Sequence, residues 1–124
     1  MKFHLNQAEG LNLFTGYGDG HVFVNQQRHD ETSLVVTPED ILRDWCDAGY
    51  EQLSPAHFAI LRDLHPEVAL LGTGTQQRFP HPRLTAPLID AGIGLEVMDT
   101  RAACRTYNIL AAEGRRVAIA LLWR

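Results

Sequence analysis

The segment Val68-Ala69-Leu70-Leu71-Gly72-Thr73-Gly74-Thr75 decides the fold class. Its first four residues form a continuous apolar run, which is typical of a strand buried on both faces of a sheet. Residues 117–122 form a further apolar run, and residues 95–98 are another segment of strand length. A helical segment lies between each strand and the next. Strands and helices that alternate at such short spacing predict an α/β fold with a layered sheet.

Capping residues mark the helices. Ser54-Pro55 is typical of a helix start. The serine hydroxyl can accept a hydrogen bond from a backbone N–H of the first turn, and proline is tolerated at the first helical position because an N–H there would have no partner within the helix. Gly92 suits the left-handed position after a helix, and Asp99 or Thr100 caps a longer helix that ends at Gly114. The buried side of this last helix is expected to carry Ala103, Tyr107, Leu110 and Ala111.

Two segments leave alternatives open. Pro87 lies inside a helical pattern over residues 83–91, so this helix either is short and begins near Thr85 or is bent at the proline. Thr37-Pro38-Glu39-Asp40 resembles a helix start, but it also suits a turn followed by a short strand over residues 41–45. The pattern slightly favours the turn and strand.

The first third of the chain predicts β-structure. Phe3 and Leu5 alternate with polar neighbours, and residues 16–20 form a glycine-rich, turn-like stretch. Residues 22–24 and 34–36 are β-rich runs separated by a polar stretch. We therefore expect them to form a hairpin with a long loop.

Composition limits the classes of function. A chain of 124 residues with 45 % apolar residues suits one domain, over residues 1–124, with an ordinary core. The net charge of −4 argues against general binding of nucleic acid. Residues 1–67 hold four basic and eleven acidic side chains, whereas residues 68–124 hold seven arginines and four acidic ones. The second half therefore favours either a local site for an anion or acidic partner, or a solvated face with scattered arginines.

The sequence predicts a cytoplasmic protein that does not span a membrane. The two cysteines, Cys46 and Cys104, cannot form the multiple disulfides of a small secreted scaffold. The N-terminal residues contain no apolar core of a signal peptide. The longest apolar run, residues 117–123, is far shorter than the roughly 20 residues that cross a bilayer.

The glycine turn after the first buried strand is the best candidate site. Ligands of open α/β sheets bind beyond the carboxyl ends of strands, and turn N–H groups can hold an anion. Gln77 replaces the third glycine of a dinucleotide fingerprint, and no lysine follows as in a P-loop, so an ordinary structural turn is the alternative. The candidate residues are Gly72, Thr73, Gly74, Thr75, Gln76 and Arg78.

The last helix offers a second candidate surface. Arg101, Arg105 and Asn108 share one polar, basic helical face that could bind an acidic group or a partner. A solvated face is the alternative. The helix starts at the end of a strand, so we expect its first residues to lie beside the bend at residues 72–75.

Motifs for catalysis or metal binding are missing from the sequence. Ser33 and Ser54 are the only serines, and neither lies in G-x-S-x-G. Cys104 precedes Arg105, which would lower a thiol pKa, but a small residue beside Ala103 is more typical of a helix core. The six histidines show no zinc-ligand spacing, so we expect no catalytic residue, no metal and no cofactor.

Two stretches together resemble a known family. The first is Leu70-Leu71-Gly72-Thr73-Gly74 with Gln76, Arg78 and Phe79, and the second runs from Gly92 to Arg115. They are similar to the family of small uncharacterised proteins that includes a mitochondrial assembly factor of respiratory complex I and an adipogenesis-associated protein. The resemblance covers nearly the whole chain and implies a compact three-layer α/β domain with a mixed central sheet. It implies no catalytic residues.

The leading hypothesis is a non-catalytic binding protein that assists assembly or biogenesis of other proteins, for which the resemblance suggests respiratory complexes or the inner membrane. Its protein partner would contact the glycine turn and the helix face of Arg101, Arg105 and Asn108. The rival hypothesis is a small-molecule or anion-binding enzyme that uses residues 72–79. A third hypothesis is a homodimer whose interface covers an apolar edge, and the sequence leaves the oligomeric state open.

Overall fold

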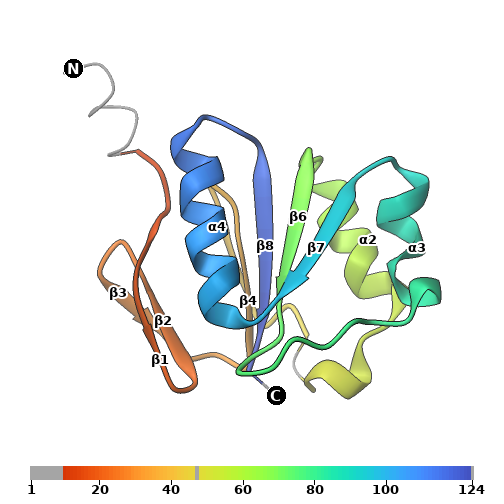
Figure 1. Cartoon of the computed structure of the whole chain (residues 1–124), viewed down its shortest axis with the longest axis horizontal. Coiled ribbons are helices and arrows are strands. Elements are labelled where there is room, and N and C mark those ends of the chain that lie inside the picture. Colours follow the sequence, from red (N-terminus) through yellow and green to blue (C-terminus); the bar gives the residue numbers. More distant parts are fainter. Residues whose placement is uncertain (1–9, 47, 124) are drawn as a thin grey trace.

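The computed structural model describes residues 10–46 and 48–123, and these form two β-sheets and four helical segments (Figure 1). The smaller sheet is antiparallel and contains β1 (Phe14–Gly18), β2 (His21–Val24) and β3 (Gln27–His29). The larger sheet contains β4 (Ser33–Val36), β5 (Ile41–Arg43), β6 (Val68–Gly72), β7 (Gly94–Met98) and β8 (Val117–Leu122). The helices are η1 (Tyr50–Gln52), α2 (Pro55–Asp63), α3 (Pro82–Asp90) and α4 (Thr100–Ala112).

The larger sheet is mixed and has the order β5-β4-β8-β6-β7. β7, β6 and β8 run parallel, whereas β4 is antiparallel to both β8 and β5. α4 and the smaller sheet cover one face, and α2 and α3 cover the other (Figure 1). This arrangement confirms the predicted α/β fold, with three layers, a mixed central sheet and a β-hairpin region near the N-terminus.

The central sheet separates two apolar cores. Because side chains alternate along a strand, Leu70 and Ile119 face α4, whereas Leu71 and Ala120 face α2 and α3. β8 lies between β4 and β6, and all six of its residues are buried. The continuous apolar runs of the sequence therefore correspond to strands covered on both faces.

The predicted helix ends agree with the structure. Asp99 caps α4 by accepting a 2.9 Å hydrogen bond from the Ala102 N–H, and Gly92 and Gly114 follow helices with φ of 75° and 82°. Before α2, the Ser54 N–H donates to Nδ1 of His57 at 3.0 Å, so the capping box uses a histidine at the position where glutamate is usual.

The two open alternatives are also resolved. Thr37 begins a turn in which its Oγ1 accepts from the Asp40 N–H at 2.9 Å, and β5 follows as a short strand. α3 begins at Pro82, with the His81 side chain accepting from the Arg83 N–H, and it continues through Pro87. The alternative in which this helix starts near Thr85 is wrong, because His81 and Pro82 provide an earlier cap and first position.

The predicted hairpin between residues 22–24 and 34–36 is wrong. β2 instead pairs with β3 through a tight turn at Asn25 and Gln26, whose φ values are 50° and 72°, as a type I′ turn requires. Residues 16–18 also belong to a strand, and the turn after β1 is confined to residues 19 and 20. The expected alternation at residues 3–5 lies outside the described residues.

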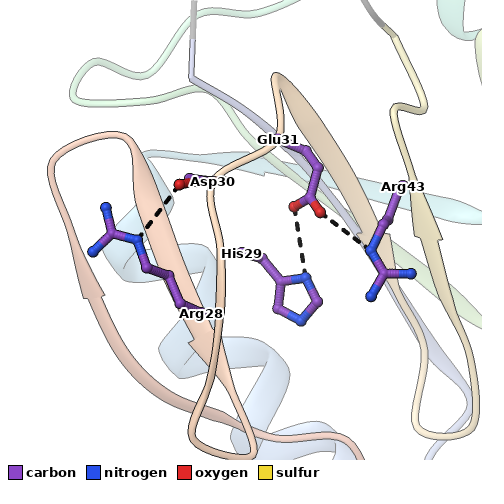
Figure 2. Close-up of polar contacts among 5 residues, drawn as sticks. All are labelled: Arg28, His29, Asp30, Glu31 and Arg43. Atoms are coloured by element: carbon purple, nitrogen blue, oxygen red, sulfur yellow. Dashed lines mark hydrogen bonds and ion pairs between the residues drawn. The ribbon is translucent and has the colours of Figure 1, made fainter.

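Figure 2 shows how the chain that leaves β3 is fastened to β5 of the larger sheet. Oε2 of Glu31 lies 3.1 Å from Nε of Arg43, and Oε1 of the same carboxylate lies 3.6 Å from Nδ1 of His29. His29 is only 3 % exposed, and neither of its ring nitrogens has a hydrogen-bond partner in the described part of the chain. The outer pair, Arg28 and Asp30, lies at the surface.

Candidate functional site

The glycine turn and the start of α4 lie side by side. The Gly74 N–H donates to Oγ1 of Thr100 at 3.0 Å, and the Thr100 N–H donates to the Gly74 carbonyl at 2.8 Å. The Thr73 N–H donates to the Met98 carbonyl at 3.0 Å. The two segments follow β6 and β7, which are parallel neighbours, so their carboxyl ends meet at one edge of the sheet, as expected from the sequence.

Thr73 shapes the turn from inside. Its buried hydroxyl donates to the Gln76 carbonyl and accepts from the Arg78 N–H at 3.1 Å. Gly74 has a φ of 85°, which favours glycine, and a Cβ there would also approach the Trp123 carbonyl to 3.3 Å. The turn is therefore held rigidly against the end of the final strand.

A pocket of about 620 Å³ opens beside this turn. It lies between three segments that are far apart in the sequence, namely the turn from β1 to β2, the glycine turn, and the first residues of α4. Its wall is closed by Trp123, which follows β8. The lining residues are Tyr17, Gly18, Asp19, Gly20, His21, Gly74, Thr75, Asp99, Thr100, Arg101 and Trp123.

Three of the predicted site residues contribute to this pocket. Gly74 and Thr75 supply the turn, and Arg101 supplies a cation whose guanidinium carbon lies 5.3 Å from the centre of the Tyr17 ring. Gly72 is packed behind them: a Cβ there would lie 2.6 Å from Cδ2 of Leu121. Gly72 therefore supports the site by close packing and does not line it.

The rest of the glycine turn points elsewhere. The Arg78 guanidinium stacks over the ring of Tyr50 at 4.2 Å and also donates to the Thr73 carbonyl at 3.4 Å. Burial raises the pKa of Tyr50, and the charge of Arg78 partly opposes that rise. Gln76 is exposed and does not line the pocket. The candidate residues after Thr75 thus belong to a neighbouring surface.

The predicted face of α4 is divided between two roles. Arg105 is exposed and lies one turn further along the helix than Arg101. Asn108 instead binds the backbone of Phe14: its Oδ1 accepts from the Phe14 N–H at 2.9 Å, and its Nδ2 donates to the Phe14 carbonyl at 2.8 Å. The amide of Asn108 is therefore occupied within the fold.

The aromatic part of the pocket was not predicted from the sequence. Tyr17, His21 and Trp123 line it, and Nε1 of Trp123 is a buried donor without a hydrogen-bond partner among residues 10–46 and 48–123. Tyr17 and Trp123 are separated by most of the chain, so no local motif could join them. The one available signal was the group of glycines around Tyr17, which marks a close approach of backbone.

The charges at the pocket are mixed. Arg101 and the start of α4 favour a negative group, because the first turn of a helix carries partial positive charge. Asp99 is engaged in capping that helix, and Asp19 lies at the turn after β1. The arrangement can therefore hold a ligand group that is acidic at one end and flat or apolar where it meets Tyr17 and Trp123.

Other groups with chemical potential do not join this site. Burial raises the pKa of Cys104 to about 12, against a smaller lowering by Arg105, so its thiol stays protonated at neutral pH. Within the described ranges, no three side chains of histidine, cysteine, aspartate or glutamate come together as a metal site. None of the described helices is long and apolar enough to cross a membrane.

Residues 14–122 match the sequence model of the family described as "Protein of unknown function (DUF498/DUF598)". The chain belongs to this family. The DUF498/DUF598 match spans every strand and helix of the fold, and with the assembly-factor relative below it confirms the resemblance seen in the sequence.

Relatives of the DUF498/DUF598 chain include proteins with printed names. The mouse protein named NADH dehydrogenase [ubiquinone] 1 alpha subcomplex assembly factor 3 is 31% identical over 71% of this chain and 48% of its own length. The 13 kDa major membrane protein of Francisella tularensis is 29% identical, with 89% of each chain covered. The present chain thus spans about half the length of the mouse assembly factor.

A solved structure has the same fold. The crystal structure of a protein from Bordetella parapertussis matches with a TM-score of 0.84 and 43% identity, and the match covers 91% of this chain and 96% of that one. The architecture described above is therefore shared with an experimental structure of a similar sequence.

Proposed function

We propose that this protein is a non-catalytic binding protein that assists the assembly of other proteins. Support at the level of the family comes from relatives whose names describe an assembly factor of NADH dehydrogenase. These relatives also favour a protein as the partner. Because the chain spans about half of such relatives, the identity of its own partner is part of the proposal.

The main support for the proposal is that the glycine turn is hydrogen-bonded to the first residue of α4. Two hydrogen bonds between Gly74 and Thr100 hold the pair rigidly, and Arg101 extends from it over Tyr17. A preformed concave site with a fixed cation suits a carboxylate of a partner protein, either an acidic side chain or a chain end. Arg105 would extend the same basic surface to a neighbouring acidic residue.

The proposed setting is the cytoplasm, with partners at the inner membrane. The Francisella relative carries the name of a membrane protein, and the assembly factors are named for a complex that oxidises NADH. A small domain that binds an acidic segment of such a partner would act before the partner is fully assembled. Fractionation of cells into soluble and membrane parts tests this setting.

The main experiment combines crosslinking with charge reversal. A photoreactive residue at exposed Thr75 should crosslink to a discrete protein in cells, and the same residue at exposed Gln27 on β3, which does not line the pocket, serves as the control. The double variant Arg101→Glu/Arg105→Glu should abolish the crosslink from Thr75. Arg28→Glu/Arg83→Glu makes the same change in net charge elsewhere and should leave it intact.

Two outcomes contradict this proposal. One is an identical set of crosslinks for both double variants, because the basic surface would then be irrelevant. The other is a folded wild-type protein that gives no crosslink from Thr75 in cells. Circular dichroism of each variant shows whether the fold is kept.

A small acidic molecule is the second candidate ligand, and it would fit the rival hypothesis of an enzyme. The volume of about 620 Å³ falls within the range of roughly 300–1,000 Å³ that is usual for ligand pockets. A panel of carboxylates and phosphates should then raise the melting temperature of the wild type, with no such rise for Arg101→Gln. Chemical conversion of a bound compound would be required to support catalysis.

A further inference from the structure

β7 forms one edge of the larger sheet and, within residues 10–46 and 48–123, is paired only on its β6 side. The hydrogen bond from the Thr73 N–H to the Met98 carbonyl fixes which backbone groups point toward β6. In a parallel strand the groups of successive residues alternate between the two sides, so Gly94, Glu96 and Met98 point toward β6. The backbone groups of Ile93, Leu95 and Val97 therefore point away from the sheet.

The first and last of these outward backbone groups already have hydrogen-bond partners within the chain. Nε2 of Gln77 donates to the Val97 carbonyl at 2.8 Å, and the Ile93 N–H donates to the Leu88 carbonyl at 2.9 Å. Among the residues that the structure describes, four outward groups between these ends have no hydrogen-bond partner: the Ile93 carbonyl, the Leu95 N–H and carbonyl, and the Val97 N–H. An exposed edge with free donors and acceptors is a template for another strand.

An apolar groove runs along this edge. Phe79 is 69% exposed and Ile89 is 61% exposed, and both line the groove together with Ile93, Leu95 and Val97. Large exposed apolar side chains that gather beside a free strand edge mark an interaction surface. The occupant must therefore offer both an extended backbone and an apolar face.

We propose that the occupant is a second copy of this chain, with the two β7 strands antiparallel and Leu95 on the two-fold axis. The two Leu95 residues then exchange two hydrogen bonds. Each Val97 N–H donates to the Ile93 carbonyl of the other copy. All four free groups of each edge are used, and the groups already bonded to Gln77 and Leu88 are not needed.

The side chains favour this register. Opposite residues of an antiparallel pair lie on the same face, so the two apolar grooves join across the axis. On the other face, Glu96 lies opposite Gly94 of the second copy, where no side chain competes. A register centred on Glu96 would instead bring two carboxylates together, which is unfavourable. The edge is thus self-complementary about Leu95 in both hydrogen bonding and charge.

Gly94 offers a clean test. A Cβ at this position meets no atom of the described residues within 4 Å, and its φ lies outside the left-handed region, so we expect a side chain there to leave the monomer unchanged. Because of the two-fold symmetry, the dimer contains two pairs of residue 94 with Glu96 of the other copy. Gly94→Glu would make both pairs repulsive, whereas Gly94→Lys would make both attractive. Cross-strand charge pairs of about 0.2–1 kcal/mol each predict a change of the dimer Kd by roughly 2- to 30-fold in opposite directions.

Sedimentation equilibrium of the purified chain measures these constants. The wild type should show a concentration-dependent dimer, Gly94→Glu should weaken it, Gly94→Lys should strengthen it, and Glu96→Lys combined with Gly94→Glu should restore it. Gln27→Glu on β3 makes the same charge change away from the edge and should have no effect. Amide exchange at Leu95 and Val97 should slow as protein concentration rises.

A protein that stays monomeric at all concentrations overturns the proposal. This holds even if an unrelated extended peptide binds β7 of that monomer. A dimer whose Kd is the same in both Gly94 variants also overturns it, since its interface would lie elsewhere. The proposal does not depend on the pocket at Arg101, because the two surfaces share no residue.

Discussion

Asn108 of α4 binds both backbone polar groups of Phe14 in β1, although 94 positions separate the two residues. The geometry fixes the orientation of the amide, because the Phe14 N–H requires an acceptor and its carbonyl requires a donor. The Tyr107 hydroxyl adds a 2.8 Å hydrogen bond to the Asn12 carbonyl. These contacts attach β1, whose Tyr17 lines the pocket, to α4.

Asn108→Ala should lower the free energy of unfolding by about 2–3 kcal/mol, because it leaves two partly buried backbone groups of Phe14 without partners. Asn108→Asp keeps only the acceptor and should also destabilise. Urea unfolding measures the loss. Unchanged stability together with lost partner crosslinking would instead assign Asn108 to binding.

Gly72→Ala should destabilise the fold by about 1–3 kcal/mol. The added Cβ would lie 2.6 Å from Cδ2 of Leu121 and 3.3 Å from Cβ of Ala103, and both neighbours are fully buried. Gly94→Ala is the matched control, since its Cβ meets no atom within 4 Å in the part of the chain that the structure describes. Thermal unfolding of the monomer should separate the two variants, and equal melting temperatures would refute the packing argument.

Cys104 should make stability fall at alkaline pH. Burial raises its pKa from 9.0 to about 12, so the folded protein keeps a proton that the unfolded chain releases. The stabilisation is complete below pH 9 and is lost as the pH rises toward 12, by at most about 1.4 kcal/mol per pH unit. Urea unfolding between pH 8 and pH 10.5 should give a flatter profile for Cys104→Ala. Parallel profiles would count against a buried thiol.

His29→Leu should leave stability unchanged or raise it by up to about 1 kcal/mol at pH 8. The ring is 3 % exposed, and its two nitrogens have no hydrogen-bond partner among the described residues. An apolar side chain of similar size would remove the energetic cost of burying these two unpaired polar atoms. Glu31→Gln should cost less than about 1 kcal/mol, because Arg43 is 56% exposed and its ion pair is hydrated. Strong destabilisation by His29→Leu would show that the imidazole has a role that this packing does not explain.

Local signals were sufficient for the second half of the fold. The apolar runs of β6 and β8, the strand pattern of β7 and the caps at Asp99 and Gly114 each depend on neighbouring residues. β3 escaped prediction because only His29 of its three residues is buried, so it has no apolar pattern. The polar stretch that it belongs to therefore resembled a loop.

The candidate site was only partly predictable. The meeting of Gly74 and Thr100 followed from the rule that parallel strands end at one edge. The pairing of Tyr17 with Trp123 across the pocket depends on how the smaller sheet packs, which no local spacing encodes. The role of Asn108 has the same cause, since helical periodicity gives its face but not its partner.

The position of β8 has a consequence for biosynthesis. It is the last of the described strands to leave the ribosome, yet it lies in the middle of the sheet between β4 and β6. Until residues 117–122 emerge, the nascent chain carries two apolar half-sheets that have nothing to join them. We expect ribosome-bound chains to be protected by chaperones and to complete the sheet in one late, cooperative step after translation of this segment.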